Sequence, residues 1–194
     1  MCLKCRLGSD WHMKTKNNKD SLRVIEQVLV LHRKNCRGKE AKYLFGPKLT
    51  GSVKGCMMPV GGHVTDGDRA FGSNGGYYTA MCRESVEECG LRPINGTKVA
   101  YLEINIINKN LIRKVTVFEC TDWIGHLKRN STKEFEWLKF FDVSKIPWNR
   151  LPPGDECWMK SVILRHSRLE VRINCGTSRL DMLCRPCTSP LYPN

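Results

Sequence analysis

The fold is decided by a nine-residue stretch, R-E-S-V-E-E-C-G-L, at residues 83–91. Its glutamates Glu84, Glu87 and Glu88 stand at positions i, i+3 and i+4, which lie along one face of a helix. Three negative charges this close repel one another unless a cation lies among them. A solvated acidic helix face is the alternative, and the spacing alone leaves both interpretations open. Gly90 is typical of a helix C-terminus, so we predict a helix over residues 79–89.

Two glycines upstream, Gly61 and Gly62, could bring a phosphate close to these carboxylates. Residues without a side chain let backbone amides approach a phosphate closely. Carboxylate oxygens suit Mg²⁺, which can bridge phosphate oxygens and stabilise the charge of an in-line displacement. We therefore predict that the three glutamates face the glycine pair. Arg83 is expected to hold a carboxylate through two hydrogen bonds rather than to act in catalysis.

The pattern from Gly62 to Leu91 resembles the Nudix hydrolase signature. That signature runs glycine, five residues, glutamate, seven residues, then R-E-aliphatic-x-E-E-x-G-aliphatic. The second half is matched by Arg83, Glu84, Glu87, Glu88, Gly90 and Leu91. Three features depart from it: the early acid is Asp68, Ser85 takes an aliphatic position, and fourteen residues separate Asp68 from Arg83. We interpret the excess, residues 71–77, as a looped insertion that leaves the helical carboxylates intact.

The resemblance extends over residues 24–185 and is closest to the oxidised-purine nucleoside triphosphatases. The matching segments are V-L-V-L at 28–31, L-F-G at 44–46, P-V-G-G-H-V at 59–64 and P-P-G-D-E-C-W at 152–158. In that family the substrate is a damaged purine triphosphate such as 8-oxo-dGTP or 2-hydroxy-dATP. The resemblance implies Mg²⁺-dependent hydrolysis to the monophosphate and pyrophosphate, with Mn²⁺ as an alternative metal.

The resemblance also assigns site residues. Catalysis is assigned to Glu84, Glu87 and Glu88; metal binding to these three with Gly61 and Glu134; and substrate binding to Lys48, Val60, Gly61, Gly62, His63 and Asp155. Asp155 matches the second of two adjacent base-reading aspartates, and the first is Gly154 here. Pro152 replaces a base-stacking tryptophan, and Met58 replaces a base-contacting asparagine. Losing these groups should cost several kcal/mol of base recognition, at about 1–3 kcal/mol each.

Two other functions stay open. One is a Nudix pyrophosphatase that acts on capped RNA or a dinucleotide, and the other is a degenerate Nudix domain that binds without turnover. The net charge of +13 favours polyanionic partners such as nucleotides, nucleic acid or an acidic membrane surface. With the resemblance, the expected partner is a purine nucleoside triphosphate, with nucleic acid as an alternative. We expect a monomer without a membrane segment or secretory signal, located in the cytoplasm or in the nuclear or mitochondrial nucleotide pools. The C-x-x-C pairs Cys2/Cys5 and Cys184/Cys187 could bind zinc, although reduced thiols are the default.

Periodicity and turn residues predict the remaining elements. Strands are expected at 24–31, 43–45, 99–107, 114–120, 137–141, 169–174 and 179–183, with a second helix at 158–168. Three prolines exclude regular structure from 147–153, and three glycines make 46–55 a loop that approaches a ligand. The class is α/β or α+β. With the resemblance, this implies an α/β/α sandwich with a mixed sheet at residues 23–185, preceded by a flexible basic arm at 1–22 and followed by a tail at 186–194.

Overall fold

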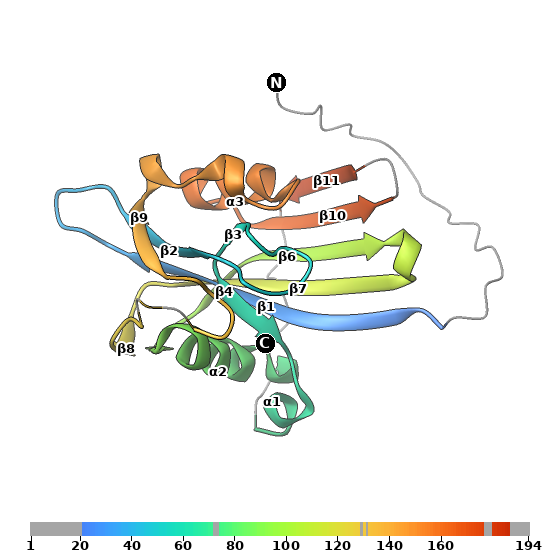
Figure 1. The fold of residues 1–194 in the computed structure, drawn as a ribbon, viewed down its shortest axis with the longest axis horizontal. Helices are drawn as coiled ribbons and strands as arrows, with labels where there is room; N and C mark the ends of the chain where they lie inside the picture. Colours follow the sequence, from blue (N-terminus) through green and yellow to red (C-terminus); the bar gives the residue numbers. More distant parts are fainter. Residues whose placement is uncertain (1–20, 72–73, 129, 131, 177–179, 187–194) are drawn as a thin grey trace.

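The computed structural model of the 194-residue chain describes residues 21–71, 74–128, 130, 132–176 and 180–186 (Figure 1). The expected N-terminal arm and C-terminal tail therefore lie almost entirely outside the described residues. The same holds for Cys2, Cys5 and Cys187 of the two C-x-x-C pairs.

Long strands dominate the described structure and form a nine-stranded mixed sheet. Its main path runs β11-β10-β6-β7-β1-β2-β3, while β4 pairs with β1 and β9 pairs with β2. The long strands are β1 (Arg23–Lys34), β6 (Thr97–Ile106), β7 (Leu111–Cys120), β10 (Leu169–Cys175) and β11 (Leu180–Pro186). Two pairs, β1 with β7 and β10 with β6, are parallel, and the other pairs in the sheet are antiparallel. The shorter elements are β2 (Lys42–Pro47), β3 (Met57–Met58), β4 (Val60–His63), β9 (Lys139–Asp142) and the separate pair β5 (Leu91–Pro93) and β8 (Trp123–Gly125).

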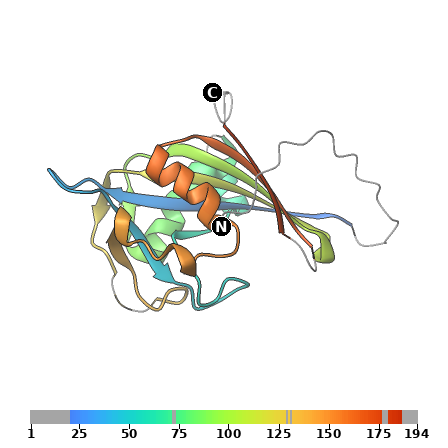
Figure 2. The same ribbon diagram turned by 90° about the horizontal axis from the view of Figure 1, so that it is seen from above.

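Two helices cover opposite faces of this sheet. Successive side chains of a strand point to opposite faces, which explains why β1 is apolar along V-L-V-L. Val28 and Val30 pack in a core cluster with helix α2 (Tyr77–Cys89). Leu31 belongs to a second cluster with helix α3 (Asp155–Arg165). Figure 1 shows α3 beside β10 and β11 and α2 below β1, and Figure 2 gives the turned view. The predicted α/β/α sandwich with a mixed sheet is confirmed.

Most predicted elements are present, with shifted ends. Helix α2 ends as predicted, because Gly90 adopts φ 76° and its N–H bonds to the Val86 carbonyl. Helix α3 begins at Asp155 instead of residue 158, directly after Gly154 at φ 90°. The segment 147–153 contains a single 3-10 turn, Trp148–Arg150, where no regular structure was expected. Two more 3-10 turns, Ile107–Lys109 and Val143–Lys145, follow β6 and β9. None of the helices among the described residues is long and apolar enough to cross a membrane.

The predicted looped insertion before α2 is only partly a loop. Helix α1 (Asp66–Phe71) runs into it, and a 3-10 turn, Asn74–Gly76, leads into α2. Thr65 and Asp68 cap α1 reciprocally: the Asp68 N–H donates to the Thr65 hydroxyl, and the Thr65 N–H donates to the Asp68 carboxylate. At Gly76, φ is 77° and an added Cβ would come within 2.6 Å of the Arg69 nitrogen. Glycine is therefore required where the insertion folds back onto α1.

Candidate functional site

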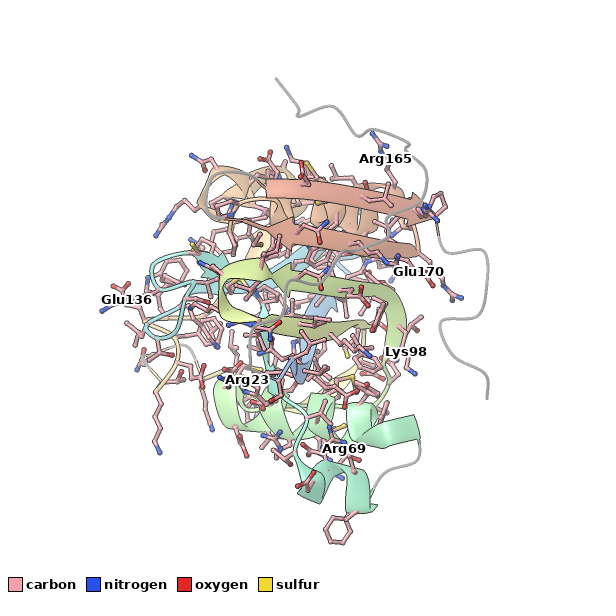
Figure 3. All side chains as sticks on the ribbon, turned by 90° about the vertical axis from the view of Figure 1, so that its right-hand side faces the viewer. Arg23, Arg69, Lys98, Glu136, Arg165 and Glu170 are labelled. Carbon is pink, nitrogen blue, oxygen red and sulfur yellow. The ribbon has the colours of Figure 1, made fainter. Side chains whose placement is uncertain are left out.

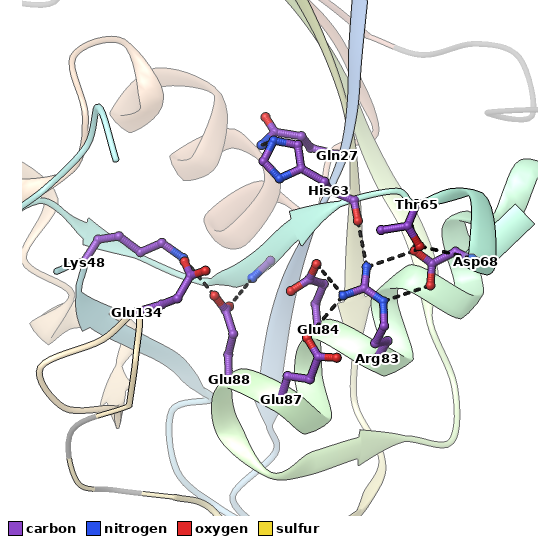
Figure 4. A network of polar contacts seen from close by, with 11 residues as sticks. Gln27, Lys48, His63, Thr65, Asp68, Arg83, Glu84, Glu87, Glu88 and Glu134 are labelled. Carbon is purple, nitrogen blue, oxygen red and sulfur yellow. Dashed lines mark hydrogen bonds and ion pairs between the residues drawn. The ribbon is translucent and has the colours of Figure 1, made fainter. Parts of the chain in front are cut away.

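Helix α2 places two glutamates directly over strand β4 (Figure 4). The Glu88 carboxylate accepts a hydrogen bond of 2.7 Å from the Gly61 N–H. The Glu84 carboxylate occupies the space that a Cβ at Gly62 would fill. The prediction that helical carboxylates face the glycine pair is confirmed for these two residues. Glu87, one turn from Glu84, stands at the rim with its side chain 58% exposed.

Arg83 holds a buried carboxylate with a two-pronged contact, as predicted. Its Nε donates to Asp68 Oδ1 at 3.0 Å and its Nη2 donates to Asp68 Oδ2 at 2.9 Å. This guanidinium, together with the Thr65 hydrogen bonds, lowers the pKa of Asp68 to about 2. Asp68 is therefore ionised at every physiological pH. The contact joins the first turn of α1 to the middle of α2 across the insertion.

The same guanidinium orients the rim of the site. Nη1 lies 2.9 Å from Glu84 Oε1 and 3.2 Å from Glu87 Oε2. Nη2 also donates to the His63 carbonyl at 2.8 Å, which connects α2 to the end of β4. One arginine thus fixes the two glutamates relative to the glycine strand.

Lys48 lies between the other two carboxylates of the site. Its ammonium is 2.8 Å from Glu88 Oε1 and 2.5 Å from Glu134 Oε2, and it stands over the Phe135 ring. The side chain is only 12% exposed. Burial opposes the charge on Lys48, but Glu88 and Glu134 outweigh it and raise the pKa of the ammonium. For Glu134, Lys48 likewise overcomes partial burial and lowers the pKa.

The two glutamates over the glycines remain short of positive charge. Burial raises the pKa of Glu88 to about 7, although Lys48 and the Gly61 N–H oppose the rise. Burial also raises the pKa of Glu84, although Arg83 opposes the rise. The existing cations therefore do not compensate for the desolvation of these carboxylates. A hard divalent cation would supply the missing charge, and carboxylate and carbonyl oxygens are the ligands that Mg²⁺ prefers.

This donor set fits Mg²⁺ in chemistry but is closed by its own cations. Within the part of the chain that the structure describes, no three His, Cys, Asp or Glu side chains lie close enough together to hold a metal ion. Arg83 lies between Glu84 and Glu87, and Lys48 between Glu88 and Glu134. A metal at this position requires one of these cations to move aside.

The substrate residues assigned from the sequence are divided between two places. Lys48, Gly61 and Gly62 lie at the carboxylates, and His63 continues β4 with its ring 3.5 Å from the Gln27 amide. The Val60 side chain is fully buried in the core, so only its backbone can reach a ligand. Asp155 lies elsewhere, at the start of α3, where it accepts a hydrogen bond from Trp158. The sequence analysis missed the capping role of Asp68, although T-x-x-D is a recognisable capping pattern.

Comparison with solved structures reveals a shared fold. A MutT protein from Bacillus halodurans superposes with a TM-score of 0.62 at 16% identity, covering 81% of this chain and 97% of that chain. A MutT protein from Methanosarcina mazei gives 0.58 at 15% identity, covering 76% and 99%. The Nudix domain of NrtR from Shewanella oneidensis, complexed with ADP ribose, gives 0.57 at 9% identity, covering 73% and 87%. No protein-family model matches the sequence, and no curated protein sequence matches it significantly. The chain thus has the fold of the Nudix hydrolases.

Proposed function

We propose that this chain is a divalent-metal-dependent Nudix hydrolase that cleaves a pyrophosphate bond in a nucleotide. The observation that carries the proposal is the placement of Glu84 and Glu88 over Gly61 and Gly62. Two buried carboxylates that lack sufficient countercharge face the backbone that a phosphate can approach most closely. The glutamates of a solvated acidic helix face would be exposed to solvent rather than buried against a glycine pair.

The residues of the site divide the work as follows. Glu84, Glu87 and Glu88 of α2, the Gly61 carbonyl and Glu134 would hold the metal, which when bound would polarise the phosphate oxygens and neutralise developing charge. Arg83 keeps the glutamates in place, as its contacts with Asp68 and Glu84 indicate. If Glu88 and Glu134 held a metal instead of Lys48, the Lys48 ammonium would be available to pair with a phosphate.

For the substrate, we propose a purine nucleoside triphosphate such as 8-oxo-dGTP or 2-hydroxy-dATP, hydrolysed to the monophosphate and pyrophosphate. The sequence resemblance over residues 24–185 and the retained Asp155 support this choice. The role of the protein would be to remove damaged nucleotides from the nucleotide pool. Capped RNA and dinucleotides are the alternative substrates, and the base-recognising groups missing at Gly154, Pro152 and Met58 favour them.

A second candidate function is a Nudix domain that binds nucleotide without turnover. The closed arrangement favours it, because Lys48 bridges Glu88 and Glu134 at ion-pair distance and no three-ligand cluster occurs among the described residues. The two candidates differ in whether a metal displaces Lys48.

One substrate panel separates these candidates. The full chain is incubated with Mg²⁺ or with a chelator and 8-oxo-dGTP, 2-hydroxy-dATP, dGTP, a capped dinucleotide or ADP ribose, and the products are resolved by chromatography. Metal-dependent release of a monophosphate and pyrophosphate supports the purine triphosphatase. Cleavage of only the capped dinucleotide or ADP ribose supports the alternative substrates.

A parallel titration with Mn²⁺, followed by the electron paramagnetic resonance of the free ion, reports metal binding without turnover. Nucleotide binding with neither cleavage nor Mn²⁺ uptake would establish the non-catalytic domain. Lys48→Met should tighten Mn²⁺ binding if the ammonium competes with the metal, whereas the exposed Lys145→Met should leave it unchanged.

A further inference from the structure

An arginine interrupts an otherwise apolar row on the α3 face of the sheet. Val115 and Val117 of β7 pack in the α3 cluster, so Arg113, two residues earlier, projects toward the same face. Strand register sets it level with apolar residues of four neighbouring strands. This row consists of Ile25, Arg113, Ile104, Ile173 and Met182.

The Arg113 guanidinium has a donor without an acceptor. Its Nε is fully buried and has no hydrogen-bond partner among the described residues. None of the ion pairs between described residues includes Arg113. A buried N–H left unpaired is unfavourable, and Arg113 as a whole residue is half-buried rather than enclosed, so a ligand with a matching acceptor can approach the guanidinium.

Asp155 and Arg113 share Cys175 as a neighbour. The pKa of the Cys175 thiol is raised first by burial and then by the Asp155 carboxylate, while the Arg113 guanidinium opposes the rise. One thiol at the end of β10 thus lies within electrostatic reach of both groups. An all-donor guanidinium on this sheet face and an accepting carboxylate at the start of the covering helix α3 together match a polar ring with an acceptor beside an N–H.

The register also gives the distance between this pair and the glycines. Gly61 is level with Leu29 of β1, and Arg113 is level with Ile25, four residues further along the same strand. At roughly 3.3 Å per residue the offset along the strand is about 13 Å, and because β4 and β7 flank β1 on its two edges, at about 4.8 Å per strand spacing, the separation is about 16 Å. An extended nucleoside triphosphate spans a comparable distance from base to phosphates.

We propose that Arg113 is a specificity-determining residue that donates to the C6 carbonyl of a 6-oxopurine. The inference rests on the proposed nucleotide-binding function. Guanine-type bases present an acceptor at C6, whereas adenine-type bases present an amino group that would face the arginine donors. The chain therefore prefers 8-oxo-dGTP and dGTP over 2-hydroxy-dATP and dATP, while Asp155 accepts from a ring N–H.

The test measures binding without turnover, by calorimetry of the full chain with the monophosphates 8-oxo-dGMP and 2-hydroxy-dAMP. The wild type should bind 8-oxo-dGMP more tightly. Arg113→Gln should lower the ratio of the two affinities at least about fivefold, because an amide can face either a carbonyl or an amino group. Arg165→Gln, which removes an exposed arginine of α3 (Figure 3), should leave the ratio unchanged.

An unchanged ratio in a folded Arg113→Gln variant would overturn the inference, as would a wild type that binds neither monophosphate. If Arg113→Gln fails to fold, Arg113→Lys serves, since it keeps the charge but loses the planar fork and should lower the ratio partially. If binding depends on Arg113 but no triphosphate is hydrolysed, the proposed catalysis is wrong and the inference about Arg113 is retained. If triphosphates are hydrolysed but the ratio of the two monophosphate affinities does not depend on Arg113, the proposed catalysis is retained and the inference about Arg113 is wrong.

Discussion

On the α2 face of the sheet, Arg83 and Lys48 are each held by two or more carboxylates, whereas on the α3 face Arg113 has a buried donor with no partner among the described residues. The remaining side chains in both cores are mainly apolar, although the α2 face also buries His32, Ser85 and Thr116. Charges paired inside the protein fix geometry before any ligand arrives, and this suits the metal-binding end of a site. In the proposed function, the unpaired Nε donor of the half-buried Arg113 belongs to the end of the site that would select the base.

The largest effect should come from breaking the α2 side at Glu88. Glu88→Gln keeps the shape and an acceptor for the Gly61 N–H but removes a charge from the metal site, so turnover of every substrate should fall roughly a hundredfold or more. Steady-state rates on 8-oxo-dGTP, 2-hydroxy-dATP and dGTP measure this. The control is Glu136→Gln, an exposed glutamate labelled in Figure 3, which should keep full activity. A selective loss on one substrate would show that Glu88 reads the base.

Next in size is the stability that the Arg83 pair provides. Arg83→Met leaves the buried Asp68 carboxylate without its cation, and the free energy of unfolding should fall by about 3 kcal/mol. Arg83→Lys should recover only part, because an ammonium cannot make both hydrogen bonds. Urea denaturation measures the loss. Lys160→Met, which breaks the exposed pair with Glu156, should cost less than about 1 kcal/mol. Equal losses in the two variants would refute a structural role for Arg83.

His32 gives the α2 face a pH dependence of defined sign. It is fully buried against Trp123, and burial lowers its pKa from 6.5 to about 4, although the Val30 backbone opposes the shift. Between these values the unfolded chain binds more protons, so falling pH should remove about 3 kcal/mol of stability. His32→Leu should lack this loss. Urea denaturation at pH 7, 5.5 and 4 measures this: the free energy of unfolding of His32→Leu should rise relative to that of the wild type as pH falls. A difference that does not change with pH would contradict the assignment.

Asp155 should give the α3 face the opposite dependence, of smaller size. Burial raises its pKa from 3.8 to about 6, although Trp158 donates to it. The folded chain therefore binds more protons between these values, and stability falls as pH rises through them. Because the side chain is partly exposed, we expect about 2 kcal/mol. The free energy of unfolding of Asp155→Asn, relative to wild type, should rise from pH 4 to pH 7. A flat difference would show that Asp155 is solvated.

Asp155→Asn should also change the preference among purine triphosphates while leaving Mg²⁺ affinity nearly unchanged. Rates on 8-oxo-dGTP, 2-hydroxy-dATP and dGTP, with Mn²⁺ titration alongside, measure both properties. Equal losses on all three substrates would mean that Asp155 does not read the base.

Local patterns predict much of the fold. The V-L-V-L run identifies β1 because a continuous apolar stretch is visible in the local sequence, and Gly90 marks the end of α2 because a glycine adopts positive φ readily. The E-x-x-E-E spacing and the glycine pair likewise predict that Glu84 and Glu88 face β4. Helix α1 escapes prediction because its six residues include Gly67 and carry no apolar period, so only the Thr65–Asp68 cap marks it.

Contacts between residues far apart in the chain cannot be predicted from the sequence, because they depend on which strands are neighbours in the sheet. Lys48 contacts Glu88 and Glu134, which are 40 and 86 positions further along the chain. From the sequence alone, Arg113 resembles an ordinary arginine on the surface of a strand. Only the position of β7 between β1 and β6 shows that its register neighbours, Ile25 and Ile104, are apolar. Such contacts follow from sheet order and register, which no local pattern encodes.

Asp68 caps α1 and holds Arg83 with the same carboxylate, and this makes the segment between them a tolerant point of insertion. The helix that bears the glutamates is positioned by a contact that spans the segment rather than by its length. Doubling a flexible connection from seven to fourteen residues costs only about 0.6 kcal/mol in closure entropy, less than the clamp provides. Chain length can therefore vary here while the geometry of the glutamates is maintained, so a peptide tag or reporter inserted after Phe71 should leave the site assembled.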